Sequence, residues 1–124
     1  MEKLYVFLVD DHKLFREGLK LLLSGLDCVG EIYEASSGQE FLNSLGNKFP
    51  DIVFMDIEMP DMDCIETTQK TLALYPEIKI IALSMYGEEA YYSKMIEAGV
   101  QGFLLKDSDI QEVESAIMLV STGK

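Results

Sequence analysis

Apolar residues occur along this chain in five short runs that are rich in β-branched and aromatic side chains. The runs are residues 4–9, 31–35, 51–55, 78–83 and 102–105. Short apolar runs that are separated by polar and glycine-containing segments are typical of buried strands. The pattern therefore predicts five short strands.

The segments between these runs change to the period of a helix. Apolar residues recur three or four positions apart, at Phe15, Leu19, Leu22 and Leu26 after the first run and at Ile110, Val113, Ile117 and Val120 after the last. This spacing places the side chains on one face of a helix. Each predicted strand is therefore followed by a helix.

Residues at the expected helix ends agree with this division. Capping-box spacing occurs in two pairs, Ser37 with Glu40 and Ser108 with Gln111. The glycines that suit the left-handed position after a helix are Gly25, Gly99 and Gly123, and Pro76 is expected to close the third helix.

Alternating strands and helices predict a parallel sheet with helices on both faces. Right-handed connections favour an α/β, doubly wound (βα)5 fold, a three-layer sandwich with the flavodoxin-like strand order 2-1-3-4-5. Glu31 and Glu34 in the second run predict an edge strand. We expect residues 1–124 to form a single domain without a second module.

Composition narrows the possible functions. The formal net charge of −12 argues against direct binding of nucleic acid or anionic lipid by this segment. No apolar run approaches the ~20 residues that cross a bilayer, so we expect no membrane segment. Cys28 and Cys64 have neither the spacing of a metal site nor the density of a disulfide scaffold, which predicts reduced cysteines in a cytoplasmic protein.

Polar side chains follow four of the predicted strands. They are Asp10 and Asp11 after the first strand, Asp56 after the third, Ser84 after the fourth and Lys106 after the fifth. Ligands of open parallel sheets bind beyond the carboxyl ends of the strands. We therefore expect these side chains to meet at one edge of the sheet.

The charges of this cluster predict a metal ion. Three carboxylates about 5 Å apart repel by about 3 kcal/mol per pair at an effective dielectric of ~20, and one lysine cannot neutralise them. Mg²⁺ prefers oxygen ligands and commonly takes one or two carboxylates together with phosphate oxygens. Asp56, at the end of the central strand, is the expected nucleophile for a phosphoryl group, with Lys106 neutralising charge and Ser84 donating a hydrogen bond.

Structural interpretations of the same residues stay open. Asp10 and Asp11 could instead cap the first helix and complement its dipole, and Lys106 could be a structural partner of one aspartate. His12 lies beside the acids without a second histidine, so we expect it at the surface or behind the ligands, and not as a phosphoryl carrier or metal ligand.

The stretches LVDD, MDIEMPDMD, ALS and GFLLKD occur in this order at the predicted strand ends. Together they resemble the receiver domain of bacterial two-component response regulators, which has a CheY-like fold, over essentially the whole chain. LVDDHKLFREGLKLLL and GFLLKD also resemble the NarL/FixJ (LuxR-type) subfamily. Members of that subfamily usually carry a C-terminal helix-turn-helix DNA-binding domain, so the resemblance implies DNA binding through a domain that is absent from this chain.

The resemblance also assigns roles at the site. It implies that Asp56 accepts a phosphoryl group from a sensor histidine kinase, assisted by Lys106. Asp11 would be a direct Mg²⁺ ligand, Asp10 a ligand through water, and the backbone carbonyl of Glu58 the third protein ligand. Beyond self-phosphorylation and slow self-dephosphorylation, no enzymatic activity is implied.

By the same resemblance, Ser84 and Phe103 form a switch that responds to the phosphoryl group. The segment 88–122 would then present the signalling surface to an effector domain of the same protein or of a partner, with a homodimer as one possible output. The chain departs from the usual receiver pattern in three places: Cys64 replaces a glycine, Asp107 a proline and Phe103 a tyrosine.

Two other functions remain open at this point. One is a Mg²⁺-dependent phosphohydrolase of the haloacid-dehalogenase type, although that family has a second aspartate where this chain has Glu58. The other is a pseudo-receiver that acts only as an interaction module, which the complete set of Asp11, Asp56 and Lys106 argues against.

Overall fold

A computed structural model of the chain describes residues 3–57, 64–84 and 89–121, with the backbone alone for residues 89–92. Its strands are β1 (Leu4–Val9), β2 (Val29–Ala35), β3 (Ile52–Asp56), β4 (Lys79–Ser84) and β5 (Gly102–Leu105). Its helices are α1 (Lys13–Ser24), α2 (Gly38–Ser44), α3 (Cys64–Leu74), α4 (Glu89–Ala98) and α5 (Ile110–Ser121). Strands and helices alternate along the chain, as the sequence predicts.

The five strands form one parallel sheet in the order β2-β1-β3-β4-β5, which confirms the predicted topology. The acidic second run is therefore an edge strand, as expected. Strand β3 lies in the centre, and all five of its residues are buried. Its neighbours β1 and β4 are buried on both faces over most of their length, which explains their nearly continuous apolarity.

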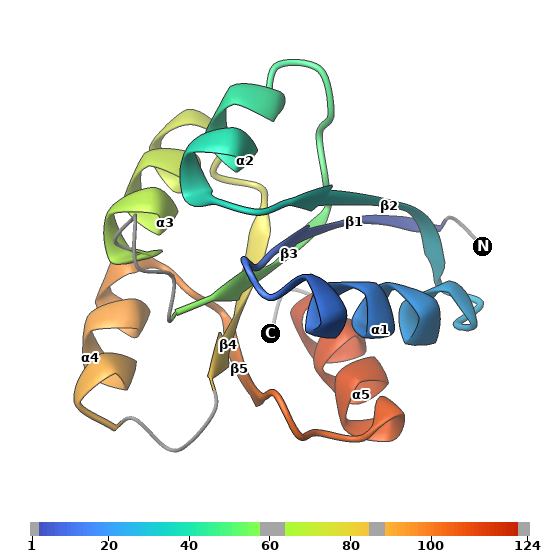
Figure 1. Ribbon diagram of the computed structural model, residues 1–124. Helices are drawn as coiled ribbons and strands as arrows, with labels where there is room; N and C mark the ends of the chain where they lie inside the picture. The colour runs from blue at the N-terminus through green and yellow to red at the C-terminus, as the bar shows by residue number, and fades with distance from the viewer. Residues whose placement is uncertain (1–2, 58–63, 85–88, 122–124) are drawn as a thin grey trace.

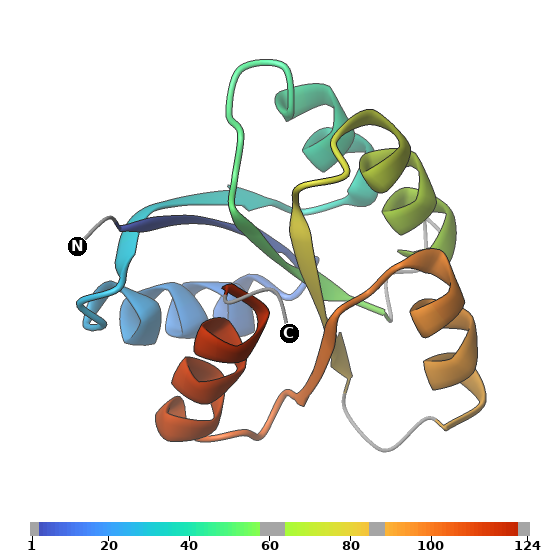
Figure 2. The same ribbon diagram turned by 180° about the vertical axis from the view of Figure 1, so that it is seen from behind.

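Helices cover both faces of the sheet (Figures 1 and 2). Helices α1 and α5 lie on one face, and α2, α3 and α4 lie on the other. Side chains of β1 alternate between the two resulting core clusters: Phe7 and Val9 face α2, α3 and α4, whereas Val6 and Leu8 face α1 and α5. The fold therefore has the three layers that the sequence predicts.

The buried face of α1 differs from the prediction. Leu19 is buried as expected, but Leu22 is 49% exposed and Leu23 is completely buried. Three consecutive leucines at positions 21–23 leave the phase of the helix open in the sequence, and the sheet selects the residue four positions after Leu19. In α5 the prediction is confirmed for Val113, Ile117 and Val120, while Ile110 is partly buried.

The helix caps are predicted correctly in part. The Ser37 hydroxyl accepts a hydrogen bond from the Glu40 N–H, as in a capping box, but the Glu40 carboxylate returns to Ser36. At α5 the expected Ser108–Gln111 pair is wrong. Asp109 and Glu112 form the reciprocal pair one residue later, each side chain accepting the other's N–H.

The glycines that follow helices also differ. Gly25 has φ −86°, so the expected left-handed conformation is wrong there, whereas Gly99 has φ +115° after α4. Gly123 lies outside the described residues. Helix α3 ends at Leu74, just before Pro76, in agreement with the expected stop.

None of the described helices is long and apolar enough to cross a membrane.

Candidate functional site

The carboxyl ends of four strands bring the expected polar side chains to one edge of the sheet. Asp10 follows β1, and Lys106 follows β5. Asp56 and Ser84 are themselves the last residues of β3 and β4, because each strand ends one residue later than the sequence predicts. Both pair within the sheet, Asp56 opposite Leu83 of β4 and Ser84 opposite Leu105 of β5, so the strand ladder fixes their backbone positions.

Asp10 is held firmly in the short connection between β1 and α1. Its side chain is 2% exposed, and its Oδ1 accepts a hydrogen bond from the His12 N–H at 2.8 Å. The Arg16 guanidinium donates to the carbonyl oxygen of Asp10. The N-cap residue of α1 is His12, which makes no side-chain capping bond. Asp10 therefore stabilises the turn that precedes α1. The alternative that Asp10 is the N-cap of this helix is wrong.

Asp56 is completely buried, although it carries a carboxylate. Its Oδ2 lies 3.2 Å from the Nζ of Lys106. A buried carboxylate needs a partner of opposite charge, because burial removes the solvation of the ion. Lys106 supplies that charge, and its own side chain is only 6% exposed.

Lys106 serves two carboxylates at once. Its Nζ lies 3.2 Å from Asp10 Oδ2 as well as from Asp56 Oδ2, and 5.0 Å from the centre of the Phe15 ring. The backbone N–H of Lys106 donates to the Ser84 carbonyl at 2.7 Å, which fixes the start of the side chain. One ammonium group thus balances two buried acids, and Asp11 adds a third negative charge at the rim, where its side chain is 31% exposed.

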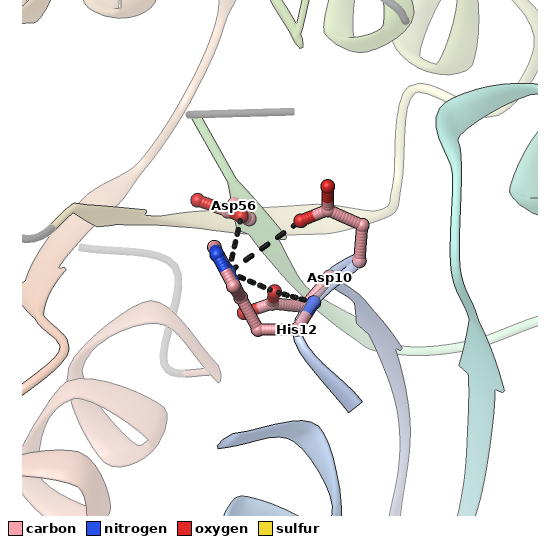
Figure 3. Close-up of side chains that lie close together, drawn as sticks. Asp10, His12 and Asp56 are labelled. Carbon is pink, nitrogen blue, oxygen red and sulfur yellow. Dashed lines mark hydrogen bonds and ion pairs between the residues drawn. The ribbon is translucent and has the colours of Figure 1, made fainter. Parts of the chain in front are cut away.

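His12 lies inside this cluster, which the sequence did not predict. Its side chain is 56% exposed, as expected for a surface residue, but its Nδ1 lies 3.1 Å from Asp10 Oδ1, 3.4 Å from Asp11 Oδ1 and 3.7 Å from Asp56 Oδ2. Figure 3 shows the ring beside Asp10 and Asp56, with dashed lines to both side chains. The same Nδ1 lies 3.1 Å from Lys106 Nζ.

The donor set fits a divalent cation. Asp10, Asp11, His12 and Asp56 each offer one ligand atom, and these atoms lie within 4.8 Å of one another. Asp10 Oδ2 is buried and makes no hydrogen bond among the described residues; the Lys106 ammonium is its ion-pair partner. Three carboxylates around one ammonium leave excess negative charge, which the hard, oxygen-preferring Mg²⁺ ion suits.

The structure describes some of the other residues singled out in the sequence, but not all of them. Ser84 is buried at the end of β4, beside β3, and Phe103 is a partly buried residue of β5 that packs against the core cluster of α2, α3 and α4. Glu58 lies outside the described residues, so its carbonyl remains a prediction. Cys64, which replaces the usual glycine, begins α3 and does not have a positive φ, since no described residue other than glycine has one. The described backbone contains no cis peptide bond, including that before Asp107.

An ion-pair network of Arg16, Lys20 and Glu34 lies next to the site and is joined to it through the Asp10 carbonyl. Glu34 of β2 accepts hydrogen bonds from Arg16 Nε and Lys20 Nζ, both at 3.0 Å. Burial raises the pKa of Glu34, but the hydrogen bonds from Lys20 and Arg16 outweigh it and hold the pKa below its usual value. Arg16 therefore connects an edge strand, α1 and the Asp10 carbonyl.

Comparison with known proteins identifies the family. Residues 6–118 match the response regulator receiver domain. The chain is 34% identical over 119 residues to the response regulator GacA of Pseudomonas viridiflava and 35% identical to the response regulator UvrY of Escherichia coli. Both matches include 96% of this chain but only 56% and 55% of the two relatives. The chain therefore spans about half their length.

Solved structures agree with this assignment. A LuxR-family two-component response regulator from Aurantimonas has a TM-score of 0.91 and 30% identity, covering 99% of this chain and 88% of that one. The receiver domain of the putative response regulator NarL from Mycobacterium tuberculosis has a TM-score of 0.91 and 31% identity, with complete coverage of both chains. The phosphohydrolase alternative is thereby set aside: this chain belongs to the receiver domains of two-component response regulators, and its relatives are of the NarL/FixJ (LuxR) type.

Proposed function

We propose that Asp56 is the phosphoacceptor of this receiver domain and that a sensor histidine kinase supplies the phosphoryl group. The observation that carries the proposal is the contact between the completely buried Asp56 carboxylate and the Lys106 ammonium at 3.2 Å, beside Asp10 and Asp11. A pseudo-receiver that acts only as an interaction module has no need for this arrangement.

Group transfer to Asp56 exchanges one bond for another. A carboxylate oxygen attacks phosphorus, and the new O–P bond of an acyl phosphate forms as the P–N bond of the phosphohistidine breaks. The electron pair of that bond stays on the departing imidazole, which leaves neutral because its other nitrogen already carries a proton. Lys106 holds a positive charge next to the attacking carboxylate and is placed to pair with the phosphoryl oxygens. Burial excludes most water from Asp56, which strengthens that electrostatic contact and slows hydrolysis.

Mg²⁺ is the proposed cofactor, and Asp10, Asp11 and Asp56 are the residues that would hold it, with the Glu58 carbonyl as a further predicted ligand. When bound, the ion would neutralise the charge that gathers on the transferred phosphoryl group. The supporting observation is the donor set itself, three carboxylates against one described ammonium group. Of the three, Asp10 is buried and Asp11 is at the rim, which agrees with different roles for the two.

The output of phosphorylation is proposed to pass through Ser84 and Phe103. Ser84 ends β4 next to β3, which ends at Asp56. Phe103 lies on the neighbouring strand β5, opposite Ala82 of β4. A new dianion at Asp56 adds about −1.5 to −2 charge, enough to draw a hydroxyl and the ammonium into new contacts. We infer that the 88–122 face then changes its affinity for an effector domain or for a second copy of the chain.

The effector is proposed to be a C-terminal helix-turn-helix domain that binds DNA. The chain spans about half of its curated relatives, one of which is the transcriptional regulatory protein DegU of Brevibacillus brevis, 31% identical over 121 residues. Self-phosphorylation from small donors and slow self-dephosphorylation complete the proposal. Both cysteines, Cys28 and Cys64, are free thiols, which supports a cytoplasmic location.

The experiment is intact-mass spectrometry after incubation with a small phosphodonor and Mg²⁺. The parent chain should gain one phosphoryl group, and Asp56→Ala and Asp56→Asn should gain none. Asp51→Asn is the matched control: Asp51 is an exposed acid just before β3, its carboxylate bonded to the Tyr5 N–H, and it should leave phosphorylation unchanged. A parent that gains no phosphoryl group, or an Asp56 variant that gains as much, would exclude Asp56 as the acceptor.

A further inference from the structure

The imidazole of His12 is the one described feature of the acidic cluster that the proposed Mg²⁺ site does not use. Its Nδ1 lies 3.1, 3.4 and 3.7 Å from carboxylate oxygens of Asp10, Asp11 and Asp56. These three oxygens come from different residues, so the nitrogen faces the centre of the cluster and not a single partner.

The neighbours of Nδ1 make opposite demands on it. The carboxylates accept hydrogen bonds and favour a protonated Nδ1, whereas the Lys106 ammonium, 3.1 Å away, can only donate and favours a lone pair there. The ammonium does not depend on Nδ1, because Asp10 Oδ2 and Asp56 Oδ2 are its partners at 3.2 Å. A divalent cation that takes the Nδ1 lone pair together with carboxylate oxygens leaves the ammonium these two partners.

The spacing also matches a metal coordination shell. A tetrahedral ion with ligands about 2.1 Å away has ligand atoms about 3.4 Å apart, close to the three separations from Nδ1. The widest pair of the four ligand atoms is within 4.8 Å, so it must approach by about 1.4 Å at most. Asp11 and His12 are the two exposed members of the cluster, so their side chains have room to rotate.

We propose that His12 makes this cluster a mixed nitrogen and oxygen site for a late first-row divalent ion, for which zinc is the best fit. Mg²⁺ prefers oxygen alone, whereas imidazole nitrogen favours Zn²⁺ and its neighbours in the transition series. Asp10, Asp11 and Asp56 would be ligands of either ion, so zinc and magnesium cannot bind at the same time. Bound zinc would also coordinate the Asp56 carboxylate, which is the proposed acceptor of the phosphoryl group. This inference rests on the proposed function in that it concerns the same carboxylates.

The first test is a competition titration of Zn²⁺ against a chromogenic chelator at fixed pH. The parent should bind one zinc ion. His12→Asn and His12→Ala should lower the affinity for zinc about tenfold or more, equivalent to about 1.4 kcal/mol. Asparagine suits the N-cap position that His12 occupies, so the first variant keeps the helix start. Glu17→Gln, an exposed acid on α1 outside the cluster, is the matched control and should bind zinc like the parent.

Calorimetric titration with Mg²⁺ separates this inference from the proposed function. Both His12 variants should bind Mg²⁺ within about twofold of the parent. If the affinity for Mg²⁺ falls as much as the affinity for zinc in these variants, His12 shapes the site without acting as a nitrogen ligand, and the inference is overturned. If the parent binds no Mg²⁺ and accepts no phosphoryl group, the proposed function fails, yet a zinc affinity that depends on His12 would still support the inference.

The second test reads the nitrogen directly. His12 is the only histidine of the chain, so its two ring nitrogens give an unambiguous ¹⁵N spectrum. Zinc should shift the Nδ1 resonance, and added Mg²⁺ should reverse the shift by competition. A spectrum that shows zinc on Nε2 with the proton on Nδ1, no shift at all, or a zinc affinity unchanged in the His12 variants would each overturn the assignment.

Discussion

Lys106 Nζ lies 3.2 Å from Asp56 Oδ2, and this contact joins the last residue of the central strand to the residue that follows the edge strand β5. Neither side chain is more than 6% exposed. The same ammonium lies 3.2 Å from Asp10 Oδ2, so a single positive charge compensates two buried acids. The stability of this edge of the sheet and its proposed chemistry therefore depend on one lysine.

Replacing Lys106 should destabilise the fold. Lys106→Met keeps the length of the side chain but leaves Asp10 and Asp56 without their ammonium partner, and removing one member of a buried ion pair costs about 3 kcal/mol or more. Urea unfolding at neutral pH without divalent ions measures this loss. Lys20→Met is the control, because Lys20 is half-exposed and its pairing with Glu34 should be worth less than about 1 kcal/mol. Equal losses in the two variants would contradict the assigned role of Lys106.

Mg²⁺ should stabilise the parent against unfolding. At a concentration of 100 times its Kd, a ligand that binds only the folded state adds about 2.7 kcal/mol to the free energy of unfolding. Asp10→Asn keeps the oxygen that accepts the His12 N–H but removes a charge, so most of this gain should disappear. Thermal unfolding with and without Mg²⁺ gives the answer. The idea that Asp10 helps to hold the ion is wrong if the variant gains as much as the parent.

The ion pairs of Glu34 should make stability depend on pH. Burial raises the pKa of Glu34, but hydrogen bonds from Lys20 and Arg16 lower it further than burial raises it, to below its usual 4.5. A lowered pKa in the folded state means that the stabilisation is present above pH 4.5 and is lost as pH falls through the lower folded value. The unfolding free energies of the parent and Glu34→Gln should therefore differ by about 1 kcal/mol at pH 6 and converge toward pH 3. A constant difference across this range would argue against the network.

Two glycine-to-alanine changes should have opposite effects. Gly99 has φ +115°, and a Cβ there would lie within 2.4 Å of Leu72 Cδ1, so Gly99→Ala should destabilise by about 1 to 3 kcal/mol. Gly18 lies inside α1, and a Cβ added there would have no neighbour within 4 Å, so Gly18→Ala should stabilise by about 0.5 to 1 kcal/mol. Chemical unfolding of both variants under the same conditions compares them. Changes of the same sign would show that backbone conformation does not control these positions.

The sequence predicts the fold well because the strand runs carry their own signal. Nearly continuous apolarity marks strands buried on both faces, and the two glutamates of the second run mark an edge. Details fail where neighbouring residues offer equivalent choices. The three consecutive leucines of α1 do not indicate which of them is buried. Both Ser108 and Asp109 are suitable cap residues for α5, and Asp109 forms the cap because Glu112 is three positions after it and returns the hydrogen bond.

Most of the site could also be predicted, because parallel strands end at a common edge. The sequence places His12 beside the acids, but its contacts with three carboxylates could not be predicted, since it has neither a paired histidine nor a motif spacing. The signal that was available is the short connection between Val9 and Lys13, which keeps every residue of the turn close to the end of β1. The ladder hydrogen bond from the Asp10 N–H to Ala35 shortens the free part of this turn further. An exposed ring in such a tight turn stays near the strand ends that surround it.

Lys106 follows His12 by 94 positions, and this separation has a consequence for the growing chain. The acids are translated early, whereas the ammonium that offsets them arrives only after β5 has been made and paired with β4. A nascent or clipped chain that stops before this strand keeps its carboxylates but lacks the cation that balances them. Competence to accept a signal is therefore withheld until β5 has been made, and copies that stop before it do not compete with longer ones for the donor.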